Sequence, residues 1–194
     1  MSNLHGRILV TGGAGFIGSA LVWALNQRGF TDIVVVDFLN PTARWQGTVP
    51  LTHNAPEKEK NLRALKFASF VEADAFRARL LADANAFGKF STVFHLGANS
   101  STTENNAAYL RDINFDYTRQ LAAWALAQGA RFIYASSAAT YGDGAQGFRD
   151  DPSVSALKSL RPMNLYGWSK HLFDMAVAER AARGEKLPPQ WAGL

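Results

Sequence analysis

One short stretch near the start of the chain sets the strongest constraint on its fold. The aliphatic run from Ile8 to Val10 has the composition of a buried strand, and a cluster of glycines follows it directly. The glycines lead into a segment with helical apolar periodicity that begins at Phe16. The sequence therefore predicts a strand, a tight turn and a helix in immediate succession.

The glycines of this turn suit a pyrophosphate lying against the main chain. Gly12 or Gly13 can take backbone angles closed to other residues, and Gly15 has no side chain where the pyrophosphate would lie. Gly18 lets the helix and the strand pack closely. The free N–H groups of the first helical turn, helped by the helix dipole, would then face the phosphates. Phosphate binding needs no charged side chain at this position.

A second buried strand strengthens this interpretation. Residues 33–36 are aliphatic and lead to Asp37, about 20 residues beyond the glycines, where a carboxylate can reach the ribose of an adenosine. Taken alone, the glycine pattern also fits an ordinary glycine-rich turn. The glycines, both strands and the acid together predict a dinucleotide-binding site of the Rossmann type.

Strands and helices alternate along the rest of the chain. Two further strands are expected at residues 92–96 and 131–135. Helices are expected at residues 16–28, 70–87, about 105–126 and about 165–183, with loops at 38–61 and 142–162. This alternation implies right-handed crossovers and predicts an α/β fold, a doubly wound parallel sheet with helices on both faces. Ligands of such sheets bind at the carboxyl ends of the strands.

The last ten residues are expected to be a tail. Pro188 and Pro189 break the helical pattern after Gly184, so residues 1–184 are expected to form the nucleotide-binding domain and residues 185–194 to lead out of it. Only four strands are expected, fewer than the usual five or six, which would leave a sheet edge unpaired. We therefore expect the N-terminal part of a longer enzyme, without its C-terminal strands and substrate lobe. The alternative is that the two prolines belong to a disordered end.

The composition argues against several classes of function. The net charge of +4 is mild, and no Lys/Arg cluster is interleaved with aromatic residues, so nucleic-acid binding is not indicated. No apolar run approaches the roughly 18 residues of a membrane span, and residues 1–7 lack the apolar core of a signal peptide. The absence of cysteine excludes disulfide and thiolate chemistry. We expect a cytoplasmic protein with no membrane partner and no metal site.

A second chemical signal lies at the start of the last expected helix. Tyr166 and Lys170 are four residues apart, so in a helix they project from the same face. A phenol needs its pKa lowered by roughly three units, about 4 kcal/mol, to act as a base near neutral pH. One charge about 6 to 7 Å away supplies about 2.5 kcal/mol at an effective dielectric constant near 20. Lys170 alone falls short, whereas Lys170 with the positive ring of an oxidised nicotinamide is sufficient.

Ser137 follows the fourth expected strand and completes this chemical set. Its hydroxyl can hydrogen-bond the same substrate oxygen as Tyr166 and stabilise a developing alkoxide. A Tyr-x-x-x-Lys spacing alone also fits a surface tyrosine beside a lysine. Its position after a nucleotide turn and a serine at a strand end favours the catalytic interpretation.

Several motifs resemble those of the extended short-chain dehydrogenases that remodel nucleotide sugars. They are the glycine turn at 11–18 and the segments at 96–98, 134–137 and 166–170. Longer blocks at 94–104, 134–142 and 164–170 resemble, within that superfamily, the ADP-glyceromanno-heptose 6-epimerase family. The resemblance runs from about residue 7 to residue 179.

This resemblance implies an activity and a set of residue roles. The family inverts C6 of ADP-D-glycero-D-manno-heptose by transient oxidation with a bound NADP, in the synthesis of the lipopolysaccharide core. Tyr166 would be one acid/base, Lys170 its electrostatic partner and Ser137 the hydrogen-bond donor to the alkoxide. The expected cofactor-binding residues are Gly12, Gly15, Phe16, Ile17, Gly18, Asp37, Phe38, Arg44, Leu96, Gly97, Ala98, Asn99, Ser100, Asn114, Tyr166 and Lys170. The residues expected to face the sugar are Ser101, Thr102, Thr103 and Glu104. The resemblance also implies an ADP-heptose partner and a homo-oligomer of the full-length enzyme.

The chain departs from the family pattern at several positions. Asn99 stands where the family usually has cysteine, and Ala73 where it often has a lysine that helps to hold the adenosine 2′-phosphate. The other phosphate-reading lysine corresponds either to Arg44 or, beyond an insertion, to Lys58. Asp37 alone favours a free 2′-hydroxyl, so NADP over NAD rests on the resemblance. The second catalytic base of the family, a lysine, comes after residue 194, so this chain by itself is not expected to epimerise.

Two other functions stay open at the level of sequence. A UDP- or dTDP-sugar 4-epimerase or 4,6-dehydratase with NAD fits the same turn, and a dehydratase needs a carboxylate beside the threonine after the third strand, where Glu104 follows Thr103. A catalytically silent dinucleotide-binding module is the second alternative. Tyr166, Lys170 and Ser137 argue against it, because binding alone needs no poised phenol.

Overall fold

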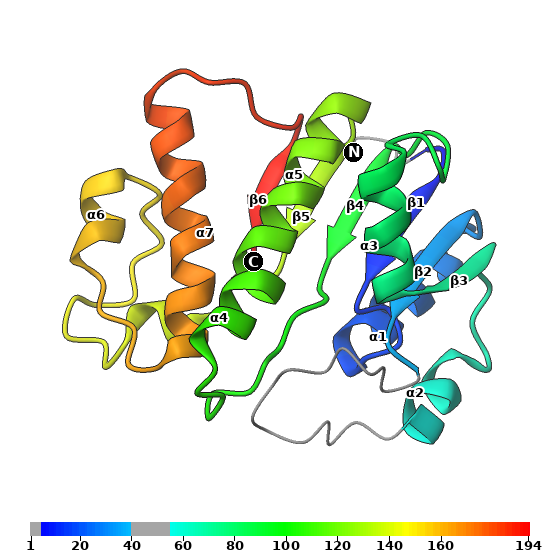
Figure 1. Cartoon of the computed structure of the whole chain (residues 1–194), viewed down its shortest axis with the longest axis horizontal. Helices are drawn as coiled ribbons and strands as arrows, with labels where there is room; N and C mark the ends of the chain where they lie inside the picture. Colours follow the sequence, from blue (N-terminus) through cyan, green and yellow to red (C-terminus); the bar gives the residue numbers. More distant parts are fainter. Residues whose placement is uncertain (1–4, 40–54) are drawn as a thin grey trace.

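Six parallel strands form one sheet at the centre of the molecule (Figure 1). The computed structural model describes residues 5–39 and 55–194. The strands are β1 (Ile8–Thr11), β2 (Ile33–Asp37), β3 (Ser69–Glu72), β4 (Thr92–His95), β5 (Arg131–Tyr134) and β6 (Trp191–Gly193). Their order is β3-β2-β1-β4-β5-β6, so the direction of winding reverses between β1 and β4. The predicted doubly wound parallel sheet is confirmed, and its switch point lies beside the glycine turn.

β3 is one of two strands that the sequence pattern does not predict. It occupies the start of the expected helix at 70–87, and the helix that forms there is the shorter α3 (Ala73–Ala82). β3 has one exposed and three half-buried residues, because it pairs with β2 alone at an edge of the sheet. A strand in that position lacks the aliphatic run that marks a central parallel strand.

β6 is the second strand outside the prediction, so the expected count of four strands is wrong. Residues 191–193 pair in parallel with β5, and Trp191 lies opposite Phe132. The indole of Trp191 stacks on that phenyl ring with 5.3 Å between the ring centroids. The segment expected to be a tail therefore contains an edge strand of the sheet, anchored by an aromatic contact.

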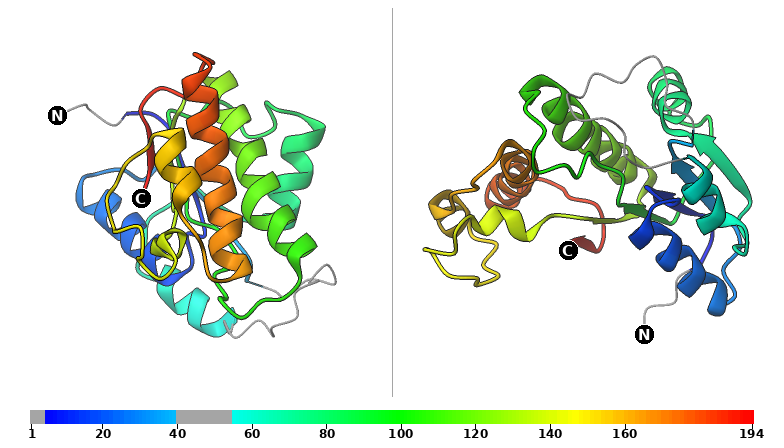
Figure 2. Two further views of the ribbon diagram at one scale, coloured as in Figure 1. Left: turned by 90° about the vertical axis from the view of Figure 1, so that its left-hand side faces the viewer. Right: turned by 90° about the horizontal axis from the view of Figure 1, so that it is seen from below.

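The helices form one layer on each face of the sheet (Figure 2). The first face carries α1 (Phe16–Gln27) and α2 (Ala55–Leu62). The second face carries α3, α4 (Ala107–Leu110), the π-helix η1 (Arg111–Asp116), α5 (Tyr117–Gln128) and α7 (Leu165–Ala182). The 3₁₀-helix η2 (Ala138–Tyr141) and α6 (Val154–Ser159) lie between β5 and α7. The expected loops at 38–61 and 142–162 thus contain α2 and α6, and the helix expected at 105–126 is interrupted by a π-helical segment.

The side chains of β1 show how the sheet is held between the two layers. Ile8 and Val10 join the core that α1 and α2 cover, whereas Leu9 joins the core on the opposite face. Successive residues of a strand point to opposite faces, so both cores draw on one continuous aliphatic run. This burial on both faces fixes the end of β1, and with it the glycine turn.

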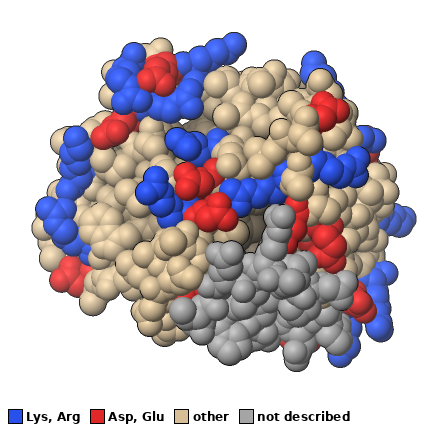
Figure 3. Space-filling view, in the orientation of Figure 1, with Lys and Arg blue, Asp and Glu red and all other residues tan. Residues whose placement is uncertain are grey.

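The face that carries α3, α5 and α7 mixes both signs of charge (Figure 3). Arg77 of α3 pairs there with Asp112 of η1, with 2.7 Å between Nη2 and Oδ1. Half-exposed pairs of this kind contribute at most about 1 kcal/mol to stability. None of the helices within residues 5–39 and 55–194 is long and apolar enough to cross a membrane.

Candidate functional site

The glycine turn after β1 has the geometry that a bound pyrophosphate requires. Gly12 has a φ of 69°, in the left-handed region that favours glycine. A Cβ added to Gly12 would lie 2.7 Å from the nitrogen of Gly97, and one added to Gly18 would lie 2.1 Å from the carbonyl oxygen of Gly12. α1 begins after Gly15, and no described side chain caps its first turn. Its first N–H groups therefore face outward, as an anion site needs.

Two large apolar side chains on this turn are exposed. Phe16 is 89% and Ile17 68% exposed. Both lie at the open N-terminus of α1, where a bound ligand would cover them. Their position agrees with the expected role in cofactor binding, which stays a prediction.

Asp37 at the end of β2 stabilises the glycine turn through a hydrogen bond to its backbone. It is 6% exposed, and its Oδ2 accepts a hydrogen bond from the N–H of Ala14 at 2.8 Å. Its Oδ1 accepts from the N–H of Phe38 at 2.7 Å and from Nζ of Lys58 at 2.6 Å. Asn61 donates from Nδ2 to the carbonyl of Ala14 at 3.0 Å. α2 thus closes against the turn and places a cation where the ribose is expected.

α2 explains which basic residue reaches the adenosine side of the site. Of the two basic residues matched to the family lysine, Lys58 lies on α2 and contacts Asp37, whereas Arg44 lies outside the described residues. The charged run at 57–60 falls within this helix. Ala73, at the other phosphate-reading position, is the first residue of α3.

A chain of buried hydrogen bonds leads from the turn toward the last helix. Oγ1 of Thr11 lies 2.6 Å from Nδ1 of His95, and Nε2 of His95 lies 2.9 Å from Oγ1 of Thr118. Thr118 donates its proton to the carbonyl of Asn114 at 2.7 Å, so it accepts from the imidazole, whose proton is on Nε2. Thr11 then donates to Nδ1. Burial, together with the nearby charge of Lys170, lowers the pKa of His95 to about 3, so the ring is neutral.

Asn114 continues this chain to α7. Its side chain accepts from the N–H of Asn99 and donates to the carbonyl of Asn99, both at 2.9 Å, and also donates to Oγ of Ser169 at 2.9 Å. Ser169 donates to the carbonyl of Tyr166 at 2.7 Å. Asn114 lies in the π-helix η1, a type of helical turn often found at functional sites. Asn99 and Asn114, expected as cofactor contacts, are therefore also structural links between β4 and α7.

Thr118→Val is a direct test of this buried chain. Valine keeps the shape of threonine but leaves Nε2–H of His95 without its acceptor, which costs about 1–3 kcal/mol. We expect the free energy of unfolding, measured by urea denaturation at pH 7, to fall by that amount. Thr118→Ser keeps the hydroxyl and should preserve the imidazole signal of a neutral ring protonated on Nε2 in nitrogen NMR spectra. Equal stability of wild type and Thr118→Val would contradict the hydrogen-bond chain.

The three residues expected to be catalytic lie on the segments that meet at the carboxyl end of β5. Lys170 is 5% exposed, and its Nζ donates to the carbonyl of Ala135 at 2.9 Å. The turn of α7 that carries Tyr166 packs closely on η2, because a Cβ on Gly167 would lie 2.9 Å from a backbone oxygen of η2. Ser137 caps η2, and its Oγ accepts from the N–H of residue 139 at 3.1 Å. Among the described residues, no acceptor for its hydroxyl proton is found.

The segment expected to face the sugar is only partly exposed. Thr102 and Thr103 are exposed and Ser101 is half-buried, with its Oγ 3.1 Å from Oγ1 of Thr103. Glu104 is 1% exposed, and its Oε1 accepts from the N–H of Asn106 at 2.8 Å. Thr102 and Thr103 are thus accessible to a ligand, whereas the carboxylate is held inside. The role of these four residues stays a prediction.

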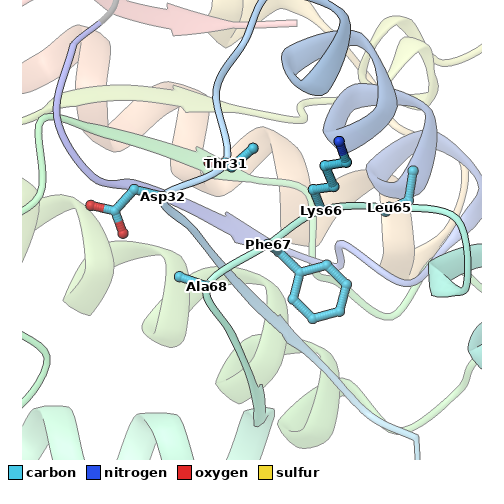
Figure 4. Close-up of a pocket in the computed structure, with 6 residues that line it drawn as sticks. All are labelled: Thr31, Asp32, Leu65, Lys66, Phe67 and Ala68. Carbon is cyan, nitrogen blue, oxygen red and sulfur yellow. The ribbon is translucent and has the colours of Figure 1, made fainter.

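Two hollows lie away from this site, near the amino ends of the strands. One, of about 630 Å³, is lined by Thr31, Asp32, Leu65, Lys66, Phe67 and Ala68, just before β2 and β3 (Figure 4). The other, of about 680 Å³, includes Arg7, Thr92 and Arg131. Ligands of doubly wound sheets bind at the opposite edge, so neither hollow is the candidate site. Among the residues that the structure describes, no group of three His, Asp or Glu side chains is placed to hold a metal ion.

Sequence comparisons are consistent with this geometry. Residues 8–189 match the model of the NAD dependent epimerase/dehydratase family. ADP-L-glycero-D-manno-heptose-6-epimerase from Fusobacterium nucleatum is 40% identical over 187 residues, 96% of this chain and 51% of the relative. The protein of the same name from Nitratidesulfovibrio vulgaris is 44% identical over 167 residues, 86% of this chain and 46% of the relative. The chain spans about half the length of the curated relatives it matches.

Solved structures support the same fold. The crystal structure of ADP-L-glycero-D-manno-heptose-6-epimerase from Helicobacter pylori has a TM-score of 0.66 and 27% identity, covering 90% of this chain and 50% of that one. UDP-glucuronic acid 4-epimerase from Bacillus cereus, in complex with NAD, has a TM-score of 0.67 and 23% identity, covering 97% and 55%. The second likeness concerns the fold alone.

Proposed function

The chain belongs to the NAD dependent epimerase/dehydratase family, and from this premise we propose that it serves the inversion of C6 of an ADP-heptose with NADP as a bound cofactor. The reaction converts ADP-D-glycero-D-manno-heptose to ADP-L-glycero-D-manno-heptose. The observation that carries the substrate is the 40% and 44% identity to enzymes of that name, together with exposed threonines at 102 and 103. The pathway to the lipopolysaccharide core, a cytoplasmic setting and a full-length homo-oligomer belong to the same proposal.

The residues of the glycine turn fit a dinucleotide. The cradle at Gly12 and Gly18 has no room for a Cβ, and the N–H groups after Gly15 are free of side-chain caps in the described part of the chain. Backbone donors at a helix N-terminus hold a pyrophosphate without a charged side chain. A bound nicotinamide supplies a site that accepts a hydride from the sugar carbon and returns it.

The chain's own residues supply the proton chemistry of this proposal. Tyr166, as one acid/base, exchanges the proton of the sugar hydroxyl on one face of the reacting carbon, and the transfer on the opposite face falls to the second base expected beyond residue 194. Lys170 stabilises the phenolate by its charge, and its contact with Ala135 fixes its position. Ser137, whose Oγ accepts from the N–H of residue 139, donates its hydroxyl proton to the reacting oxygen. Inversion needs no net oxidation, so no cofactor is consumed.

Turnover of the heptose substrate tests the proposal. The complete product of the reading frame that encodes this chain is incubated with ADP-D-glycero-D-manno-heptose and NADP, and the sugar is followed by proton NMR. We expect the C6 epimer to appear with no net change in NADP. Inversion of a UDP-sugar at C4 or a dehydrated keto sugar, with NAD, would instead favour the alternative enzymes. Dinucleotide binding without any turnover would favour a silent binding module.

The contact between Lys58 and Asp37 supports NADP over NAD. The Nζ atom lies 2.6 Å from the carboxylate, so the two charges cancel where an adenosine ribose would lie. A carboxylate alone repels a 2′-phosphate, whereas a neighbouring ammonium offers it a charge-assisted hydrogen bond. The site therefore suits a ribose with a 2′-phosphate.

Lys58→Met tests this cofactor preference. Methionine keeps much of the side-chain length but removes the charge, which costs about 1.5–3 kcal/mol for a hydrogen bond to a charged group. We expect NADP affinity, measured by calorimetry, to fall about 10- to 100-fold and NAD affinity to stay constant or rise. Lys60→Met changes an exposed lysine of the same helix and should alter neither. Equal losses for NADP and NAD would show that Lys58 does not distinguish them.

A further inference from the structure

Asp174 lies on α7 one helical turn beyond Lys170 and two turns beyond Tyr166. Residues four apart share a helix face, so the three side chains form one row. The carboxylate of Asp174 accepts hydrogen bonds from the hydroxyl of Tyr134 and from Oγ of Ser136, each at 2.5 Å. The mechanism proposed above gives this half-buried acid no role.

Asp174 and Lys170 bind to adjacent residues at the end of β5. Tyr134 and Ser136 are the two neighbours of Ala135, whose carbonyl accepts from Nζ of Lys170 at 2.9 Å. At the end of β5, Tyr134 and Ser136 therefore both bind the carboxylate of Asp174, and Ala135 between them binds the ammonium of Lys170. Each carboxylate oxygen has its own short hydrogen bond, so the carboxylate is fixed relative to the lysine.

Lys170 needs a nearby negative charge because it is buried. A buried ammonium with a neutral acceptor is costly unless a counter-charge lies close. The titratable groups that interact with Lys170 or Asp174 in the described structure are His95 on β4, Tyr134 on β5 and His171 on α7. Arg161, before α7, acts on His171, and Tyr166 precedes Lys170 by one turn on the same helix face. Among the described groups that act on the ammonium, Asp174 is the carboxylate, and its charge favours the protonated lysine.

We propose that Asp174 is a positioning residue that supplies the counter-charge for the Lys170 ammonium, with Tyr134 and Ser136 fixing the carboxylate. Its consequence for turnover rests on the function proposed above. The ionisation of Lys170 is a property of this chain alone and can be measured without substrate.

The charge of Asp174 determines the direction in which the pKa of Lys170 shifts. Burial lowers the pKa of Lys170 to about 8, and the charge of Asp174 opposes that decrease. Burial also raises the pKa of Asp174, whereas its hydrogen bonds from Ser136 and Tyr134 lower it and favour the ionised form. Removal of the carboxylate charge therefore moves the pKa of Lys170 further down. Because the protonated lysine supports the tyrosine, turnover is lost as pH rises through that pKa, and the loss would begin at a lower pH.

Asp174→Asn in this chain, with ¹³C-labelled lysine, tests the inference by NMR titration of Lys170. The charge of Asp174 raises the pKa of Lys170, so we expect the titration midpoint of Lys170 to fall when that charge is removed. Glu179→Gln removes a half-buried acid of the same helix, paired with Lys158 at 3.8 Å, and should leave the midpoint unchanged. An unchanged midpoint in folded Asp174→Asn would overturn the proposal.

A second pair of variants separates charge from folding. Asp174→Glu and Asp174→Gln have side chains of equal length, and only the first keeps the charge. A higher Lys170 midpoint in the Glu variant supports the counter-charge, and equal midpoints refute it. In the complete enzyme, the alkaline limb of kcat should move down in Asp174→Asn while the Kd for NADP stays within twofold. A shifted midpoint without heptose turnover would reject the proposed function and keep this inference, whereas heptose turnover with an unshifted midpoint would do the reverse.

Discussion

Tyr166→Phe is expected to lower the rate of C6 inversion by about 10²- to 10⁴-fold, the range for loss of a general acid–base group. The substitution removes one oxygen atom and keeps the ring. The carbonyl of Tyr166 still accepts from Ser169, so the first turn of α7 keeps its link to Asn114. NADP affinity is therefore expected to stay within about twofold. Single-turnover kinetics on the heptose substrate and calorimetry with NADP measure the two quantities.

Tyr117→Phe is the matched control for this prediction. Tyr117 is buried on α5, and its hydroxyl has no hydrogen-bond partner within the described residues. Removal of a buried hydroxyl without a partner is neutral or stabilising, so turnover and binding should both match wild type. If Tyr166→Phe kept more than a tenth of wild-type turnover, the phenol would not be the acid/base. Equal losses of turnover and NADP affinity would assign it to binding instead.

The central strands can be predicted because their burial on both faces requires a local run of aliphatic residues. β1 and β2 are covered on both faces, and such strands consist of uninterrupted aliphatic residues. β3 and β6 are edge strands of four and three residues with no fully buried position. Their extended conformation comes from the free hydrogen-bonding groups of β2 and β5. Each partner strand lies elsewhere in the chain, so no local sequence pattern predicts β3 or β6.

The candidate site likewise has a part that local sequence predicts and a part that depends on long-range packing. The glycine turn, Asp37 and the pair Tyr166 and Lys170 follow local spacing rules of turns and helices. The buried chain from His95 to Thr118 joins residues 23 positions apart, and Asp174 bonds to a tyrosine 40 positions earlier. Contacts of that range depend on the packing of α5 and α7 against the sheet. The available sequence signals were a histidine at the end of an aliphatic strand and an acid four residues after the lysine.

Gly18→Ala is expected to destabilise the fold and to abolish tight dinucleotide binding. The added Cβ would lie 2.1 Å from the carbonyl oxygen of Gly12 and 2.7 Å from Cα of Gly13. Both are backbone atoms of the turn, so no side chain can move aside. The turn must then open or α1 must shift, although Val22 and Leu25 bury α1 against the sheet. Forced overpacking of this kind costs about 1–3 kcal/mol, which we expect in the free energy of unfolding.

The effect of Gly18→Ala on binding should exceed its effect on stability, because the displaced backbone N–H groups are the proposed ligands of the phosphates. Loss of one hydrogen bond to a charged group costs about 1.5–3 kcal/mol, so NADP affinity should fall at least about tenfold. Gly29→Ala is the control: Gly29 ends the same helix with a φ of 83° and open space around the added Cβ. It should lose about 1–2 kcal/mol of stability from backbone strain alone and keep its NADP affinity. Calorimetry of NADP binding to both folded variants then separates a loss of stability from a loss of phosphate binding. If both variants bound NADP with equal affinity, dinucleotide binding would not depend on the close contact between Gly12 and Gly18.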